Sequence, residues 1–145
     1  MFSGITEVRP LTKSDLTPKI VSDINSLLKR QHTKADTVDA ETIREHLSKS
    51  VIVVALQDLR VIRLGILIRG HCLSHSFGSI HNLIVQKDYD VLVLGMQIVK
   101  RLTEGIYDLD FIEAGTWLQD DQLIDILKAL EFVAKPKLRY KLKLR

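Results

Sequence analysis

A strand, a polar loop and a long apolar helix between Ile80 and Leu102 constrain this chain more than any other segment. The strand-like segment from Ile80 to Val85 predicts the strand, and apolar residues resume after five mostly polar positions. This layout is typical of loops that bind phosphate groups at a helix N-terminus. Such loops are rich in glycine, yet Gly95 is the only glycine from Asp90 onward in the predicted turn. The segment therefore predicts a phosphate-binding scaffold that has lost most of its small residues.

Length and composition favour one intracellular domain. A chain of 145 residues buries enough surface to fold without a metal or a disulfide, and we expect residues 1–145 to form a single domain. Cys72 is the only cysteine, which excludes an internal disulfide and fits a reducing compartment. The chain opens with no signal segment, and no apolar run approaches the ~18–20 residues that cross a bilayer. We therefore expect a cytoplasmic protein without a membrane contact.

The basic C-terminal tail has the pattern of a strand. The net charge is only +3, and much of the excess lies from Lys135 onward. Cations alternate there with Leu138, Tyr140, Leu142 and Leu144. Period-two alternation is typical of a strand with one wet face. The tail therefore predicts final strand material, in preference to a contact with nucleic acid.

Strands and helices alternate along the rest of the chain. β-Branched runs predict strands, and apolar residues at helical spacing predict helices. We expect strands over residues 5–10, 51–56, 60–69, 77–85 and 111–117, and helices after residue 15, from about 38 to 47, over 91–105 and over 120–130. Phe132, Val133 and the tail would close the sheet. This order predicts an α/β domain with a mixed central sheet of about six to seven strands flanked by helices.

Several segments together carry a resemblance to a known family. They are the opening Val8 to Leu16, the strand ending Leu83-Ile84-Val85, the loop to Gly95 and the late Leu130-Glu131-Phe132. With the order of elements, these segments resemble the GNAT superfamily of acyl-CoA-dependent N-acetyltransferases over nearly the whole chain. The resemblance implies a GNAT-like fold and a transferase that moves an acetyl group from acetyl-CoA to a primary amine on a small molecule or a peptide.

The resemblance also implies where coenzyme A would bind. In that family the loop reads Arg or Gln, two residues, Gly, one residue, then Gly or Ala, and its backbone N–H groups hold the pyrophosphate. The thioester carbonyl bonds to backbone N–H groups of the preceding strand. The matching cofactor-binding positions here are Leu83, Val85, Asp90, Val91, Val93, Leu94, Gly95 and Met96.

The loop departs from the family pattern at several of these positions. The basic residue of the family falls on Asp90, its required glycine on Val93 and a common glycine on Val91. Two further family glycines fall on Arg63 and Glu131. A carboxylate beside a diphosphate and a side chain where the backbone must approach both oppose binding. We therefore expect acetyl-CoA binding to be weak or lost, either in a natural pseudoenzyme or in an engineered variant.

His81 is the predicted catalytic residue. In glucosamine-phosphate-type members a carboxylate on the strand before the loop lies near the acceptor amine, and His81 matches it. Imidazole exchanges protons near neutral pH, so His81 suits a general base, although a histidine held only by packing fits the sequence equally well. The tyrosine that serves as general acid in the family matches Leu127. His71 and His75 flank a turn and are candidates for the acceptor pocket.

Two classes of function stay open at this point, and neither needs a metal. His71, Cys72 and His75 lack the second pair of ligands that a zinc site requires.

The first class of function is an N-acetyltransferase, in which Glu113 would face the gap where acceptors bind. The second is a noncatalytic GNAT-fold module for binding or self-assembly. An exposed apolar row from Val91 to Leu94 would favour a partner, and a homo-oligomer such as a dimer is expected under either reading.

Overall fold

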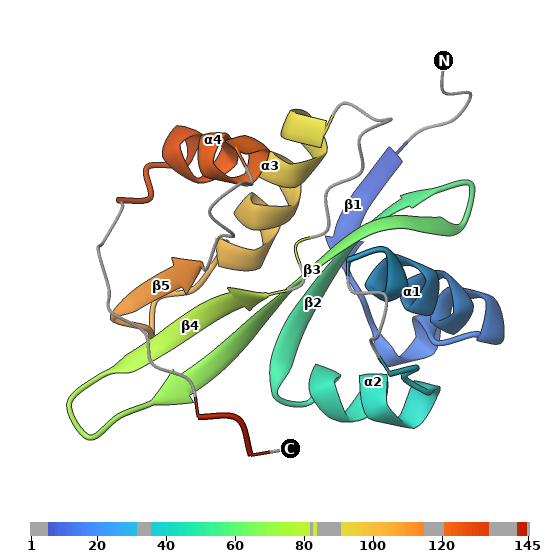
Figure 1. The fold of residues 1–145 in the computed structure, drawn as a ribbon, viewed down its shortest axis with the longest axis horizontal. Coiled ribbons are helices and arrows are strands. Elements are labelled where there is room, and N and C mark those ends of the chain that lie inside the picture. Colours follow the sequence, from blue (N-terminus) through green and yellow to red (C-terminus); the bar gives the residue numbers. More distant parts are fainter. Residues whose placement is uncertain are drawn as a thin grey trace.

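The computed structural model describes residues 6–31, 36–81, 83, 91–114, 121–133 and 142–144. Its centre is a five-stranded sheet with helices on both faces (Figure 1). The strands are β1 (Thr6–Pro10), β2 (Ser50–Gln57), β3 (Arg60–His71), β4 (Ser76–His81) and β5 (Phe111–Ala114). The helices are η1 (Lys13–Asp15, a 3-10 turn), α1 (Pro18–Gln31), α2 (Ala40–Leu47), α3 (Val91–Thr103) and α4 (Asp121–Ala129).

The strands lie in the sheet in the order in which they follow along the chain. Each neighbouring pair from β1 to β4 is antiparallel, whereas β5 runs parallel to β4. A parallel pair needs a long crossover, and α3 lies in the connection between these two strands. The expected α/β fold with a mixed sheet is therefore confirmed.

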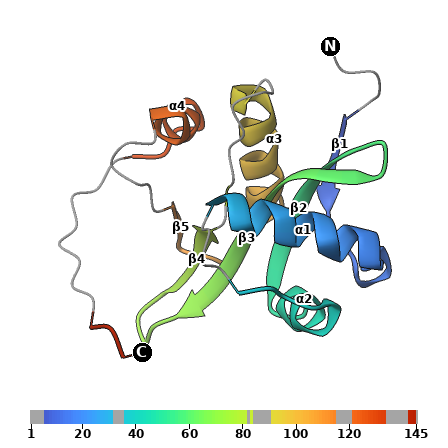
Figure 2. The ribbon, with the colours of Figure 1, turned by 45° about the vertical axis from the view of Figure 1, so that its right-hand side comes forward.

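The two faces of the sheet carry separate apolar cores. Helices α1 and α2 cover one face, and α3 and α4 cover the other (Figure 2). Strands β2 and β3 are buried on both faces, which explains their nearly continuous apolar sequences. The core under α1 and α2 includes Ile24, Leu27, Ile43, Val54 and Leu64, and the core under α3 includes Leu67, Ile80, Ile98, Leu102 and Ile126.

A polar cluster fixes the chain between β1 and α1. The Arg9 guanidinium donates to both carboxylate oxygens of Asp15, at 2.8 and 2.9 Å. The same carboxylate accepts hydrogen bonds from the Thr12 backbone N–H at 2.7 Å and the Thr12 hydroxyl at 2.8 Å. Led by the Arg9 bond, these contacts hold the pKa of Asp15 well below its usual range. The cluster therefore stabilises the reversal of the chain that places α1 on the sheet.

The predicted six to seven strands are not matched, because the described residues form five. Phe132 belongs to the cap that follows α4, since the Phe132 N–H donates to the Leu127 carbonyl at 2.9 Å and the Glu131 N–H to the Lys128 carbonyl at 3.0 Å, and Val133 is not part of a strand. Residues 142–144 are not part of a strand, and Leu142 is 83% exposed. Residues 134–141 lie outside the described residues.

Two smaller differences concern length and membrane contact. The strand expected over residues 77–85 ends at His81, and Leu83 is buried without belonging to a strand. Val85 lies outside the described residues. Within the part of the chain that the structure describes, the helices are too short or too polar to span a membrane.

Candidate active site

Strand β4 presents packing residues on one face and polar or aromatic residues on the other. Ile80 is 4% exposed and belongs to the core under α3. Gly78 lies on the same face, where an added Cβ atom would meet the side chains of Leu67 and Leu109 at 2.9 and 3.0 Å. Because successive strand residues point to opposite faces, Phe77, Ser79 and His81 share the face on which α1 and α2 lie.

Strand β5 extends this second face. The parallel register pairs Phe77 with Phe111 and Ser79 with Glu113. The intervening residue Ile112 packs against the core under α3, so Phe111 and Glu113 point the other way. Since α1 packs on β3 and α2 on β2, this part of the sheet is left uncovered by the described helices (Figure 2). We call it the open face: Phe77, Ser79, His81, Phe111 and Glu113.

His81 has one fixed partner on the open face. Its Nε2 atom lies 2.8 Å from the hydroxyl oxygen of Ser79, and its side chain is exposed. When Nε2 carries the proton and donates it to Ser79, the lone pair of Nδ1 is available to a ligand. The bond to Ser79 therefore orients His81 as a proton acceptor at the end of β4.

The two other predicted histidines lie at the opposite end of β4. His71 Nδ1 is 2.8 Å from the Ser76 hydroxyl, and His75 Nδ1 is 2.9 Å from the Ser74 hydroxyl. They belong to the turn between β3 and β4, whereas His81 is the last residue of β4. The structure thus does not bring these three histidines together. Among the described residues, no group of three or more side chains is suited to hold a metal ion.

Helix α3 begins at Val91, in agreement with the helix predicted over residues 91–105, so the loop to Gly95 is helical in its described part. Gly95 lies within the helix and is buried, and an added Cβ atom would collide with Ile126 of α4. Its small size therefore permits close packing of α3 on α4. The α3 N-terminus still offers backbone N–H groups and the positive end of a helix dipole, which fit a diphosphate. Asp90 itself lies outside the described residues.

The apolar residues expected at the coenzyme site divide between surface and core. Val93 is 48% exposed, while Leu94 and Met96 pack against the core under α3. An exposed row of four is therefore wrong for Leu94, because successive helical positions point about 100° apart. The side chains of Val91 and Leu92 are outside the described set. Leu127, the match to the family's general acid, is buried in the same core.

Two residues that replace family glycines have different consequences. Arg63 is 0% exposed and pairs with Ala55, which belongs to the core under α3. A buried guanidinium is costly without a partner, and Arg63 does have an interaction partner. Glu131 has a φ of 67°, the left-handed conformation that glycine adopts at helix C-termini. A residue with a side chain therefore adopts there a backbone conformation that favours glycine.

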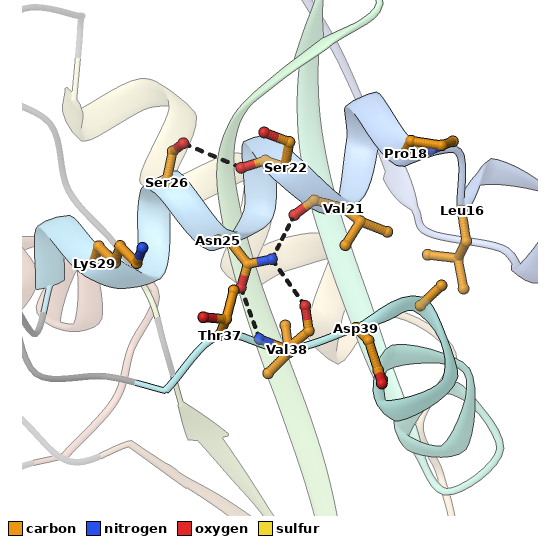
Figure 3. A pocket seen from close by; sticks show the side chains of 11 residues that line it. Leu16, Pro18, Val21, Ser22, Asn25, Ser26, Lys29, Thr37, Val38 and Asp39 are labelled. Carbon is orange, nitrogen blue, oxygen red and sulfur yellow. Dashed lines mark hydrogen bonds between the residues drawn. The ribbon is translucent and has the colours of Figure 1, made fainter.

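A separate pocket of about 590 Å³ lies between α1 and residues 37–40 (Figure 3). Asn25 joins its two walls, because its amide nitrogen donates to the Val38 carbonyl at 2.8 Å and its oxygen accepts from the Val38 N–H at 2.8 Å. Asp39 accepts from the Thr42 N–H at 2.8 Å, and this bond lowers the pKa of the Asp39 carboxyl. These polar groups are engaged in joining α1 to α2, and His81 is not part of this pocket.

Comparison with solved structures identifies the fold. The chain superposes on an acetyltransferase from Trypanosoma brucei with a TM-score of 0.73 and 19% identity, covering 95% of this chain and 100% of that one. Glucosamine-6-phosphate N-acetyltransferase from Arabidopsis thaliana gives 0.72 and 14%, with 97% and 99% covered. An aminoglycoside N-acetyltransferase in complex with CoA gives 0.75 and 12%, with 99% and 98% covered.

These similarities establish the fold of the chain but not its reaction. No family model matches this chain. No curated protein matches it significantly either. The chain has the fold of GNAT acetyltransferases, so the resemblance seen in the sequence is confirmed at the level of the fold. Because one fold hosts many activities, function has to be argued from the site.

Sequence reasoning missed the aromatic part of the open face. The rings of Phe77 and Phe111 stack, with centroids 5.8 Å apart and planes inclined by 11°. Their contact depends on the parallel register of β4 and β5, which residues far apart in the sequence establish. The spacing of Phe77, Ser79 and His81 at every second position was a signal that these three share a face.

Proposed function

We propose that this chain is an acetyl-CoA-dependent N-acetyltransferase that acts on a primary amine. The hydrogen-bonded pair of His81 and Ser79, at the end of the strand that leads into α3, carries the proposal. The GNAT fold supports it, and one solved structure of that fold contains CoA. When bound, the coenzyme would supply a thioester as acetyl donor. The N-terminus of α3 would hold its diphosphate.

His81 would prepare the acceptor for attack. A primary amine is protonated at neutral pH and cannot act as a nucleophile until it loses that proton. With Nε2–H donating to Ser79, Nδ1 of His81 accepts the proton from the ammonium group, directly or through one water. Ser79 is the positioning residue, because its hydroxyl orients the imidazole ring and accepts from Nε2 in the tautomer that leaves Nδ1 basic.

Replacing His81 tests this role. His81→Ala should lower kcat/KM for amine acetylation by about 10²-fold or more, the usual contribution of a general base, while the affinity for acetyl-CoA stays the same. His71→Ala is the matched control, because His71 also bonds to a serine but lies at the other end of β4. Equal activity in both variants and in the native chain would refute the assignment of the base.

We further propose that Asp90 weakens the coenzyme site. It directly precedes α3, where a carboxylate favours the helix dipole and repels a bound diphosphate. Asp90→Asn removes the charge and keeps a residue that caps helices well. It should tighten acetyl-CoA binding by about 2- to 5-fold in calorimetric titration, and the gain should shrink at high salt. No gain at low salt would contradict this reading of the loop.

The alternative function is a noncatalytic GNAT-fold module that binds a partner or a second copy of itself. The observation that favours it is the 48% exposure of Val93 in the first turns of α3. If Val93 forms such a contact, sedimentation should reveal an oligomer that Val93→Glu dissociates. A monomeric native chain would dispose of this alternative.

A further inference from the structure

Three aromatic rings gather at the end of the open face that is farthest from His81. Besides the Phe77–Phe111 stack, the His75 ring lies 5.2 Å from Phe111 and 6.0 Å from Phe77, measured between centroids. We call Phe77, Phe111 and His75 the aromatic shelf. The rings come from β4, β5 and the turn before β4, so the fold assembles the shelf from separate segments.

The shelf is accessible to a ligand. Phe111 is 42% exposed, and Phe77 and His75 are half-buried. Ile68, which pairs with Ser79 and therefore points to the same face, is 37% exposed. Leu142 and Leu144 near the C-terminus are 83% and 84% exposed, so their side chains are not buried against these rings.

The backbone beneath the shelf is shaped to receive a ring. Gly70 pairs with Phe77 across β3 and β4, and a Cβ atom added at Gly70 would lie 2.9 and 3.0 Å from two Phe77 ring atoms. The Phe77 ring therefore occupies the space that a side chain at position 70 would need. Gly70 on one side and Phe111 on the other fix the ring within the shelf.

Charge and spacing connect the shelf to His81. Phe77 and His81 are four residues apart on one strand, which corresponds to about 13 Å. Ser79 lies midway, and its register partner Glu113 places a carboxylate on the same face. The open face thus has a proton acceptor at one end, an acidic middle and an aromatic surface at the other end. Such a surface complements an elongated amine with an apolar ring.

We propose that the acceptor is a primary amine with an aromatic group, which stacks on the aromatic shelf while the amino group reaches His81. This inference rests on the proposed acetyltransferase function and names the substrate class of the same site. Aromatic rings gain stacking energy beyond the burial of their area, and packing against the exposed Phe111 ring, which Phe77 supports from the other side, supplies it. A substrate without a ring keeps the contact at His81 and loses the shelf.

A matched pair of amines tests the proposal on the full chain. 6-Phenylhexylamine spans much of the distance from His81 to the shelf, and hexylamine has the same linker without the ring. The native chain with acetyl-CoA should show a kcat/KM at least about tenfold higher for the aryl amine. Phe111→Leu and Gly70→Ala, which remove one ring and displace another, should reduce that preference to less than about threefold. Tyr107→Leu, at a 93% exposed tyrosine before β5, should preserve it.

Two readouts separate this inference from the proposed function. If the native chain acetylates both amines equally, the shelf proposal fails and the acetyltransferase stands. If neither amine is acetylated, calorimetry without coenzyme decides: binding of 6-phenylhexylamine that Phe111→Leu abolishes supports the shelf, and no binding overturns it. A native dimer that Phe111→Leu dissociates would also overturn it, because the shelf would then be a subunit contact. A variant with a lower Tm and an unchanged preference would indicate a structural role only.

Discussion

Helices α1 and α2 cover only half of the sheet face on which they lie, and the two halves differ in chemistry. Over β1 to β3 the face is apolar and buried, with side chains such as Val54 and Leu64 at 0% and 4% exposure. Over β4 and β5 the same face carries Ser79, His81 and Glu113 beside an aromatic stack. The covered half holds the fold together, and the open face is where a ligand can meet reactive groups.

The largest effect should come from a charge placed in the covered half. Val54→Asp would bury a carboxylate at a site with 0% exposure, and we expect it to lower the free energy of unfolding by about 4 kcal/mol or more. The same substitution at the exposed His81 should cost less than about 1 kcal/mol. Urea unfolding of both variants measures the difference. Similar costs at the two positions would show that the open face is packed after all.

The next effect concerns the polar cluster that places α1. Asp15→Asn removes the ion pair with Arg9 and weakens the bonds to Thr12, at an expected cost of about 1–2 kcal/mol at pH 7. Because the pKa of Asp15 is lowered in the folded state, its contribution is present above the ordinary pKa of about 4 and is lost as the pH falls below it. Stabilities of the native chain and the variant should therefore converge in acid. A difference that does not depend on pH would contradict the ion pair.

Glycine substitutions in the hairpin between β2 and β3 should raise the free energy of unfolding by a smaller amount. Asp58 and Leu59 have φ values of 52° and 63°, as a two-residue turn of type I′ requires. Leu59→Gly should raise stability by roughly 0.5–1 kcal/mol, because glycine adopts this conformation without strain. Glu131→Gly should act in the same direction. Thermal unfolding that gives a lower Tm for both variants would argue against these backbone conformations.

His81→Ala should change the free energy of unfolding least, although it should lower the rate of acetyl transfer most. His81→Ala removes an exposed side chain with one hydrogen bond, so the free energy of unfolding should change by less than about 0.5 kcal/mol. The expected loss of acetyl transfer would then come from an intact fold. A large loss of stability in this variant would instead make His81 a structural residue, as the sequence alone allowed.

The sequence predicted the covered half well, because its signals are local. The spacing of Ile20, Ile24 and Leu27 predicts an amphipathic helix, and all three are buried in α1. The strands over residues 51–56 and 60–69 are predicted from two β-branched runs, and β2 and β3 confirm them. Each of these elements depends on residues close together in the chain, where periodicity is informative.

The part of the chain from β4 onward was harder to predict, because its contacts join residues that are far apart in the sequence. The period-two pattern of Phe132 and the tail suggested more strands, yet the cap of α4 uses Phe132. Gly95 resembled a ligand-binding glycine, and only the approach of Ile126 from α4 reveals its packing role. His81 was identified from a family resemblance. Its partner Ser79 and the neighbouring rings needed the strand register.

Titration calorimetry of the full chain with acetyl-CoA, repeated with CoA alone, tests whether this chain is an acetyltransferase. We expect saturable binding of one coenzyme per chain, with a dissociation constant on the order of micromolar because Asp90 opposes the diphosphate. No binding by a cooperatively folded protein would contradict an acetyltransferase and favour the noncatalytic alternative.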